Sequence, residues 1–176
     1  NRRPNGLDLL IVSRTCYGGV VRFTRQGTMS TPLGPHAPIS PDTFAERVFE
    51  WRERVEGVEF LNASFTQTMS YAEDGDIIYC DPPYVDSQSI LYGAQDFSFQ
   101  ELIRQIGICK EIGAKVVLYI DGTKKSGSKK IELNIPKGLF EREIYLDYGS
   151  SMRRRFQNGG NEMVGEDVHE RLLLTW

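Results

Sequence analysis

The sequence is short of the residues on which most metal sites and many catalytic triads depend. Its 176 residues contain only two histidines and three cysteines. The cysteines, Cys16, Cys80 and Cys109, form no Cys-x-x-Cys pair, so we expect neither a metal site nor a histidine-driven triad. Scattered cysteines of odd number are typical of reduced thiols, and we therefore expect a cytoplasmic protein.

An excess of positive charge and long apolar runs are lacking as well. The chain has 21 Lys and Arg against 24 Asp and Glu, so its overall charge indicates no polyanionic partner. No apolar run approaches the roughly 20 residues that span a bilayer. Basic residues gather only locally, and a solvated face is the default interpretation of each cluster. These clusters are Arg2-Arg3, Arg22 with Arg25, Lys124-Lys125, Lys129-Lys130 and Arg153-Arg154-Arg155.

The content of 40% hydrophobic residues is sufficient for a globular domain with a core. Residues 7–17 are dense in apolar side chains, which favours a buried helix and leaves a strand as the alternative. Residues 18–41 predict a hairpin around Gln26-Gly27, followed by an irregular loop. From Ser40 the spacing of apolar residues predicts a helix that stops at Gly57.

The second half of the chain predicts a β-α-β unit. Residues 76–80 form a consecutively apolar strand whose two faces should both be covered. An amphipathic helix follows Ser98, which has Glu101 three residues later as in a capping box. Residues 115–122 form the next strand, and this order requires a parallel pair. Two more strands are predicted over 139–149 and 169–176, so the fold class is α/β.

The segment Asp81-Pro82-Pro83-Tyr84 follows the first of these strands. Ligands of open parallel sheets bind beyond the carboxyl ends of the strands. Neither proline can donate a ladder hydrogen bond, so the segment leaves the sheet as a stiff arm. The Asp81 carboxylate and the Pro82 carbonyl could together accept both hydrogens of a planar amino group.

Tyr84 could stack on the ring that bears such an amino group. Stacking of a base on an aromatic side chain contributes about 1 to 3 kcal/mol, which is close to the few kcal/mol needed to extrude a base from a duplex. The alternative is that the prolines merely end the strand and that Asp81 caps a turn. We favour a binding role because an apolar strand precedes the segment and an aromatic residue closes it.

With these residues the sequence resembles the adenine-N6-specific DNA methyltransferases of the DNA adenine methylase type, found in bacteria and their phages. The family signature, DPPY at the end of a strand, is matched by residues 81–84 without substitution. Residues 150–176 resemble the family's C-terminal Ser and Asn-Gly-Gly loop with its final strand. Residues 17–34 resemble the segment leading into a DNA-contacting hairpin, at Gly19, Arg22, Gly27, Pro32 and Gly34.

The resemblance implies a Rossmann-like S-adenosylmethionine-dependent methyltransferase sheet in the C-terminal part, with a small inserted DNA-recognition hairpin region. Residues 1–56 would form the target-recognition region with its connecting helix, and residues 57–176 the catalytic portion. The implied reaction transfers a methyl group from S-adenosylmethionine to a flipped adenine in double-stranded DNA. The implied catalytic residues are Asp81, Pro82, Pro83 and Tyr84; the cofactor-binding residues are Phe65 and Asp81; the DNA-binding residues are Arg22, Arg25, Arg153, Arg154 and Arg155.

The sequence departs from the family pattern in its N-terminal part. It contains no Gly-rich F-x-G-x-G loop of the kind that holds the methionine part of the cofactor, Gly18 stands where the family usually has Asn, and the acid often found before Phe65 is missing. We therefore expect a further N-terminal segment or a complementary chain. Without it, the strand at residues 76–80 would be a hydrophobic sheet edge.

Two other functions remain open. A catalytically inactive DNA-binding module would explain the missing Gly-rich loop. A related methyltransferase acting on RNA or on a protein amide would use a similar Pro-Pro-aromatic segment, although the hairpin with Arg22 favours DNA.

Overall fold

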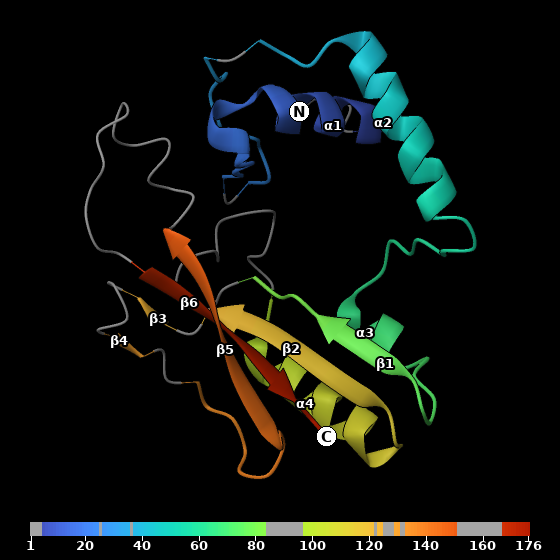
Figure 1. The fold of residues 1–176 in the computed structure, drawn as a ribbon, viewed down its shortest axis with the longest axis vertical. Helices are drawn as coiled ribbons and strands as arrows, with labels where there is room; N and C mark the ends of the chain where they lie inside the picture. The colour runs from blue at the N-terminus through green and yellow to red at the C-terminus, as the bar shows by residue number, and fades with distance from the viewer. Residues whose placement is uncertain are drawn as a thin grey trace. The chain divides into compact units, whose positions relative to one another are not determined.

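Helices come before the first strand, and strands follow the last helix, along the residues that the computed structural model describes, which are 5–24, 26–35, 37–83, 97–121, 123–124, 129–130, 133–150 and 167–176 (Figure 1). These residues fall into two units, one between residues 5 and 62 and one comprising 63–83 and the described residues from 97 to 176. In this part of the chain no helix is long and apolar enough to cross a membrane. In chain order the elements are α1 (Gly6–Thr15), η1 (Tyr17–Gly19), α2 (Pro41–Arg54), α3 (Phe65–Met69), β1 (Ile77–Cys80), α4 (Phe99–Glu111), β2 (Lys115–Asp121), β3 (Thr123–Lys124), β4 (Lys129–Lys130), β5 (Arg142–Ser150) and β6 (Asp167–Leu174).

The first unit contains the two helices that the sequence predicts near the N-terminus. Asn5 caps α1 and Ser40 caps α2, because each side chain accepts a hydrogen bond from a backbone N–H in the first turn of its helix. Both predicted helices are confirmed, but the burial predicted for residues 7–17 is wrong, since no residue of α1 is buried. Among the described residues of this unit only Cys16 and Val21 are buried, so these described residues form no apolar layer over the helix.

The hairpin predicted around Gln26-Gly27 is confirmed as a chain reversal. The Ser30 N–H donates to the Arg22 carbonyl at 2.9 Å, and Phe23 pairs with Met29 in an isolated antiparallel bridge. Gly27 has a φ of 75°, a left-handed conformation that glycine adopts without steric cost. The pairing does not extend into regular strands.

The second unit is built on a four-stranded mixed sheet with the order β1-β2-β6-β5. β1 and β2 are parallel, with Cys80 opposite Leu118, and α4 connects them. β6 is antiparallel to both β2 and β5. The predicted β-α-β unit and the two predicted final strands are therefore confirmed, and the fold is of the α/β class. A separate two-stranded ribbon of β3 and β4, which was not predicted, follows β2.

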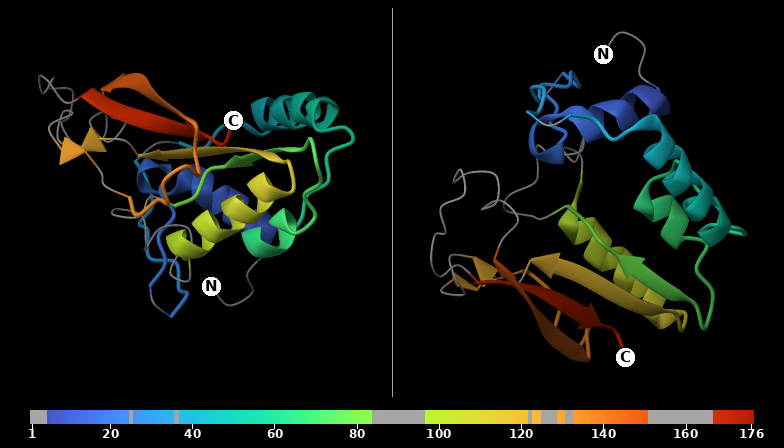
Figure 2. Two further views of the ribbon diagram at one scale, coloured as in Figure 1. Left: turned by 90° about the horizontal axis from the view of Figure 1, so that it is seen from below. Right: turned by 45° about the horizontal axis from the view of Figure 1, so that its top comes forward.

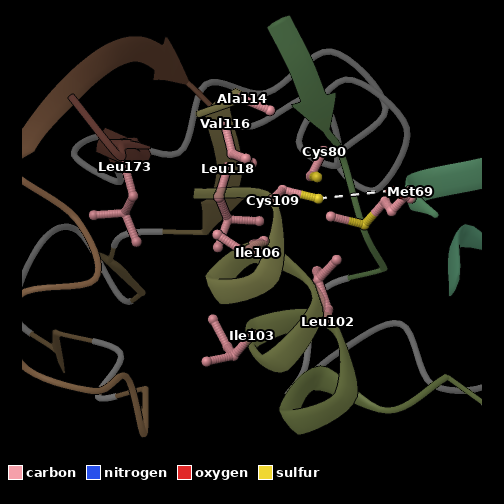
Figure 3. Packing of buried hydrophobic residues seen from close by; sticks show 10 residues of the cluster. All are labelled: Met69, Cys80, Leu102, Ile103, Ile106, Cys109, Ala114, Val116, Leu118 and Leu173. Atoms are coloured by element: carbon pink, nitrogen blue, oxygen red, sulfur yellow. Dashed lines mark hydrogen bonds between the residues drawn. The ribbon is translucent and has the colours of Figure 1, made fainter. Parts of the chain in front are cut away.

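The core of the second unit lies between α4 and the sheet face that it covers (Figure 3). Val116, Leu118 and Ile120 alternate along β2 and are completely buried. Val116 and Leu118 pack with Ile106 and Cys109 of α4, which are also completely buried. This alternation of buried and less buried residues shows that β2 uses one face for the core.

The prediction that both faces of β1 are covered is wrong. Cys80 is buried, but Ile77 is 72% exposed and Tyr79 is 60% exposed. α3 and α4 both lie on the other face of the sheet (Figure 2), so within the described part of this unit no helix covers the face that carries Ile77 and Tyr79. β1 is also the end strand of the sheet, which confirms the predicted hydrophobic edge.

Candidate active site

Asp81, Pro82 and Pro83 leave the sheet at the carboxyl end of β1. The ladder between β1 and β2 ends at the pair of Cys80 and Leu118. It cannot continue on the β1 side through Pro82 or Pro83, because proline has no N–H to donate. Asp81 is exposed and both prolines are partly buried. The segment thus takes the position that the sequence predicts for it, beyond the end of a strand in a parallel pair.

A pocket of about 300 Å³ opens beside this segment. Its walls include Phe65 and Met69 of α3, Ile78 of β1, Leu102 of α4, Phe97 and residues 81–83. Binding pockets for small molecules range from about 300 to 1,000 Å³, so this pocket is of a size for one flat heterocycle. Its lining is mostly apolar, and Asp81 supplies a carboxylate.

Two phenylalanines shape the apolar wall. The rings of Phe65 and Phe97 meet edge to face, with centroids 5.8 Å apart and an angle of 61° between their planes. This arrangement is one of the geometries that aromatic pairs prefer. Phe65 is the first residue of α3, which Ser64 caps, and Phe97 precedes Ser98, the cap of α4. The capped N-termini of α3 and α4 therefore fix the positions of the two rings.

The inner wall of the pocket belongs to the core. Met69 and Leu102 are both buried. The Cys109 thiol donates to the Met69 carbonyl with a sulfur-to-oxygen distance of 3.8 Å, the dashed line in Figure 3. This contact joins α3 to α4 beneath the pocket. The inner wall of the pocket is thus part of the hydrophobic core of this unit.

The carboxyl group of Asp81 is more basic than an ordinary aspartate. Although the residue as a whole is exposed, partial burial of its carboxyl raises the pKa, and the negative charge of Glu170 raises it further. Glu170 lies on β6 opposite Asp121, the last residue of β2. One oxygen of Glu170, Oε2, is buried and has no hydrogen-bond partner among the described residues. Both effects make Asp81 a stronger acceptor for a donor such as an amino group.

Sequence reasoning missed α3 and the role of Phe97 in the pocket wall. The signals were available, because Ser64 and Gln67 have the spacing of a capping box. The Gln67 N–H donates to the Ser64 hydroxyl at 3.3 Å. Phe97 and Leu102 hold the positions of a hydrophobic staple around the cap Ser98, and both residues line the pocket.

Of the remaining predicted site residues, Arg22 belongs to the first unit and the others lie outside the described residues. Arg22 is exposed in the hairpin of the first unit, where its backbone N–H donates to the Thr31 hydroxyl at 2.8 Å. Outside the described residues lie Tyr84, Arg25, Arg153, Arg154 and Arg155.

Comparison with known proteins places these features in a family context. Residues 2–148 match the model of the D12 class N6 adenine-specific DNA methyltransferases. The chain is 32% identical over 76 residues to the Retron Ec67 DNA adenine methylase of Escherichia coli, covering 43% of this chain and 26% of that protein. It is 32% identical over 79 residues to the DNA adenine methylase of Serratia marcescens, covering 44% of this chain and 28% of that protein. The DNA N-6-adenine-methyltransferase of Escherichia phage P1 is 28% identical over 148 residues, covering 80% of this chain and 17% of that protein. The matched part thus spans between 17% and 28% of the length of these relatives.

Proposed function

Because the chain belongs to the D12 class N6 adenine-specific DNA methyltransferase family, we propose that it carries the base-holding part of a site-specific DNA adenine-N6 methyltransferase. The reaction transfers a methyl group from S-adenosylmethionine to a flipped adenine in double-stranded DNA. In this proposal the four-stranded sheet is part of a Rossmann-like methyltransferase sheet. The catalytic portion comprises residues 57–176, and residues 1–56 form the target-recognition region.

The observation that carries the proposal is the pocket beside residues 81–83 at the carboxyl end of β1. In our mechanism the Asp81 carboxylate and the Pro82 carbonyl accept the two hydrogens of the adenine amino group, and Tyr84 stacks on the base. Such contacts orient the nitrogen lone pair for attack, and orientation is a large part of the catalysis of two-reactant steps. Extrusion of the base from the duplex brings it within reach of these groups.

Asp81 also has a role in proton transfer. The amino nitrogen must release a proton once it has gained a methyl group. The raised pKa of Asp81 makes its carboxylate a better acceptor for that proton, as general base catalysis requires. Glu170 supports this role because its negative charge contributes to the shift.

The residues of the pocket fit part of S-adenosylmethionine. When bound, this cofactor supplies an electrophilic methyl group. A mostly apolar pocket of about 300 Å³, walled by Phe65 and Phe97, suits its flat adenine ring better than its charged methionine part. Phe65 would hold that ring by contact with its face or edge, and Asp81 would lie between the cofactor and the base.

The partners in the proposal are double-stranded DNA and a further protein segment. Arg22, Arg25 and the run Arg153–Arg155 would contact the DNA, most of them at phosphates. The exposed apolar edge of β1 favours pairing with a strand of an N-terminal segment or of a complementary chain. Since the relatives named above come from bacteria and a phage, we place the reaction in the bacterial cytoplasm.

Radiolabelled methyl transfer to duplex DNA tests the proposal with two matched variants. Asp81→Ala removes a carboxylate at the carboxyl end of β1, and Glu111→Ala removes an exposed one at the end of α4, beside the start of β2. We expect Asp81→Ala to lower the rate at least tenfold, or by about 1.4 kcal/mol, and Glu111→Ala to leave it unchanged. Equal rates for Asp81→Ala and the wild type would overturn the role of Asp81. No transfer and no cofactor binding in calorimetry, with salt-sensitive duplex binding retained, would favour the inactive DNA-binding module.

A further inference from the structure

Thr68 of α3 brings a hydroxyl-bearing side chain to the wall of the pocket beside residues 81–83. It follows Phe65 by three residues and precedes Met69, so these residues share one face of the helix, and all three line the pocket. Thr68, Met69 and Ile78 also line a second cavity of about 220 Å³, so Thr68 lies where the two cavities adjoin. In a mostly apolar wall, a few polar groups determine which ligand is bound.

The proton of the Thr68 hydroxyl is used within its own helix. The hydroxyl donates toward the Phe65 carbonyl at 3.1 Å and toward the Ser64 carbonyl at 3.4 Å. The Ser64 carbonyl already accepts from the backbone N–H groups of Gln67 and Thr68, at 3.0 and 3.1 Å. A hydroxyl has one proton and two lone pairs. With its proton directed at the backbone, the Thr68 hydroxyl can only accept from a further group.

An acceptor of this kind is complementary to a ligand that presents an N–H group. No group among the described residues donates to the Thr68 hydroxyl. A ligand that fills the pocket displaces water from the wall, and an acceptor left unpaired by that displacement costs free energy. The exocyclic amino group of adenine is a donor, whereas the oxygen at the same ring position of an oxopurine is another acceptor.

We propose that Thr68 determines the cofactor specificity of this pocket: its hydroxyl accepts a hydrogen bond from the amino group of the cofactor's adenine and so selects an aminopurine over an oxopurine. The inference rests on the proposed function, because it takes the pocket beside Phe65 as the place of that ring. It adds to that function a selection among nucleosides, which the apolar walls alone do not provide. A site that hydrogen-bonds one ligand group discriminates strongly against an analogue without it.

The test measures the binding of two ligands to the full chain by calorimetry. One is S-adenosylhomocysteine, the demethylated form of the cofactor, and the other is S-inosylhomocysteine, in which an oxygen replaces the amino group. Thr68→Val removes the hydroxyl and keeps the branched shape, and Thr68→Ser keeps the hydroxyl. Thr66→Val is the matched control, because Thr66 lies in the same helix, has its hydroxyl 2.7 Å from the Ser64 hydroxyl, and lines neither cavity.

We expect the wild type to bind the adenosyl ligand at least about tenfold more tightly than the inosyl ligand. Thr68→Val should reduce this preference to below about threefold, whereas Thr68→Ser and Thr66→Val should keep it. The preference is a ratio measured on one variant, so a loss of stability that weakens both ligands equally does not change it. Thr68→Ala, which favours the helix, carries the same expectation if Thr68→Val does not fold.

An undiminished preference in Thr68→Val would overturn the inference while leaving the proposed methyl transfer intact. Equal affinity of the wild type for the two ligands would do the same. If the wild type binds neither ligand, the pocket is not a cofactor site, and the inference fails together with the cofactor role of Phe65. The methyl-transfer experiment with Asp81→Ala tests the base-holding role separately, so the two failures are distinguishable.

Discussion

Replacing Ile106 with alanine tests the packing that supports the pocket. Ile106 lies in α4, is completely buried, and follows Leu102 of the pocket wall by one helical turn. The change removes three buried carbon atoms, which corresponds to roughly 2 to 3 kcal/mol of transfer free energy. The cavity left behind adds to this cost, so we expect a total loss of about 3 to 4 kcal/mol in the free energy of unfolding.

Ile108→Ala is the matched control, because Ile108 belongs to the same helix and is 40% exposed. Its loss should stay below about 1 kcal/mol, since less apolar surface returns to water and alanine favours the helix. Urea unfolding measures both values. The chain has two tryptophans, Trp51 and Trp176, so a Trp51→Phe background makes the fluorescence of Trp176 a probe of the second unit.

One outcome of comparing Ile106→Ala with Ile108→Ala would refute this reasoning. If both variants lose the same free energy at an unchanged urea dependence, α4 does not pack against the sheet through Ile106. A change in the urea dependence of only one variant would instead point to an altered unfolded state or a loss of two-state behaviour.

Three further predictions concern the edge strand, a buried thiol and an ion pair. Ile77→Lys should change the free energy of unfolding by less than about 0.5 kcal/mol and reduce self-association in light scattering, because Ile77 is exposed on an edge strand; increased scattering would contradict this. Burial raises the pKa of Cys80 to about 11, so its reaction with a thiol reagent at pH 8 should be much slower in the folded chain than in urea, and equal rates would disprove its burial. Hydrogen bonding to Arg104 lowers the pKa of Glu101 from 4.5 to about 2, so its stabilising contribution is present above about pH 4.5 and is lost as the pH falls toward 2. Arg104→Gln should weaken this part of the acid dependence of unfolding, and an identical acid profile would refute the assignment.

The β-α-β unit and the last two strands of the second unit were predictable because each signal was local and agreed with the others. The cap at Ser98 is a short-range pattern, and the Glu101 N–H donates to the Ser98 hydroxyl at 3.3 Å as expected. Even so, the second hydrogen bond of a capping box, from the Ser98 backbone N–H to the Glu101 carboxylate, does not form as the spacing suggests. The Glu101 carboxylate accepts from Arg104 and Gln105 instead. A spacing rule predicts a helix start better than it predicts each hydrogen bond.

The pocket was less predictable because its walls come from elements that are distant in sequence. The position of Asp81 follows from the strand before it, but the contact between Phe65 and Phe97 depends on how α3 and α4 meet. The ribbon of β3 and β4 was missed for another reason. Its sequence is rich in lysine and has no apolar alternation, so no rule of hydrophobic periodicity identifies it as a pair of strands.

The error about β1 carries the most information about the complete site. Its consecutive apolar residues predicted coverage on both faces, yet α4 covers only the face of Cys80 and leaves Ile77 and Tyr79 exposed. A stacked pair of Tyr79 and Tyr119, with ring centroids 6.3 Å apart, extends this apolar surface onto β2. Contiguous apolar surface on a sheet is typical of a face that packs against another element. The sequence pattern of β1 is therefore explained if a further segment covers this face, and that segment would lie on the strand that immediately precedes Asp81.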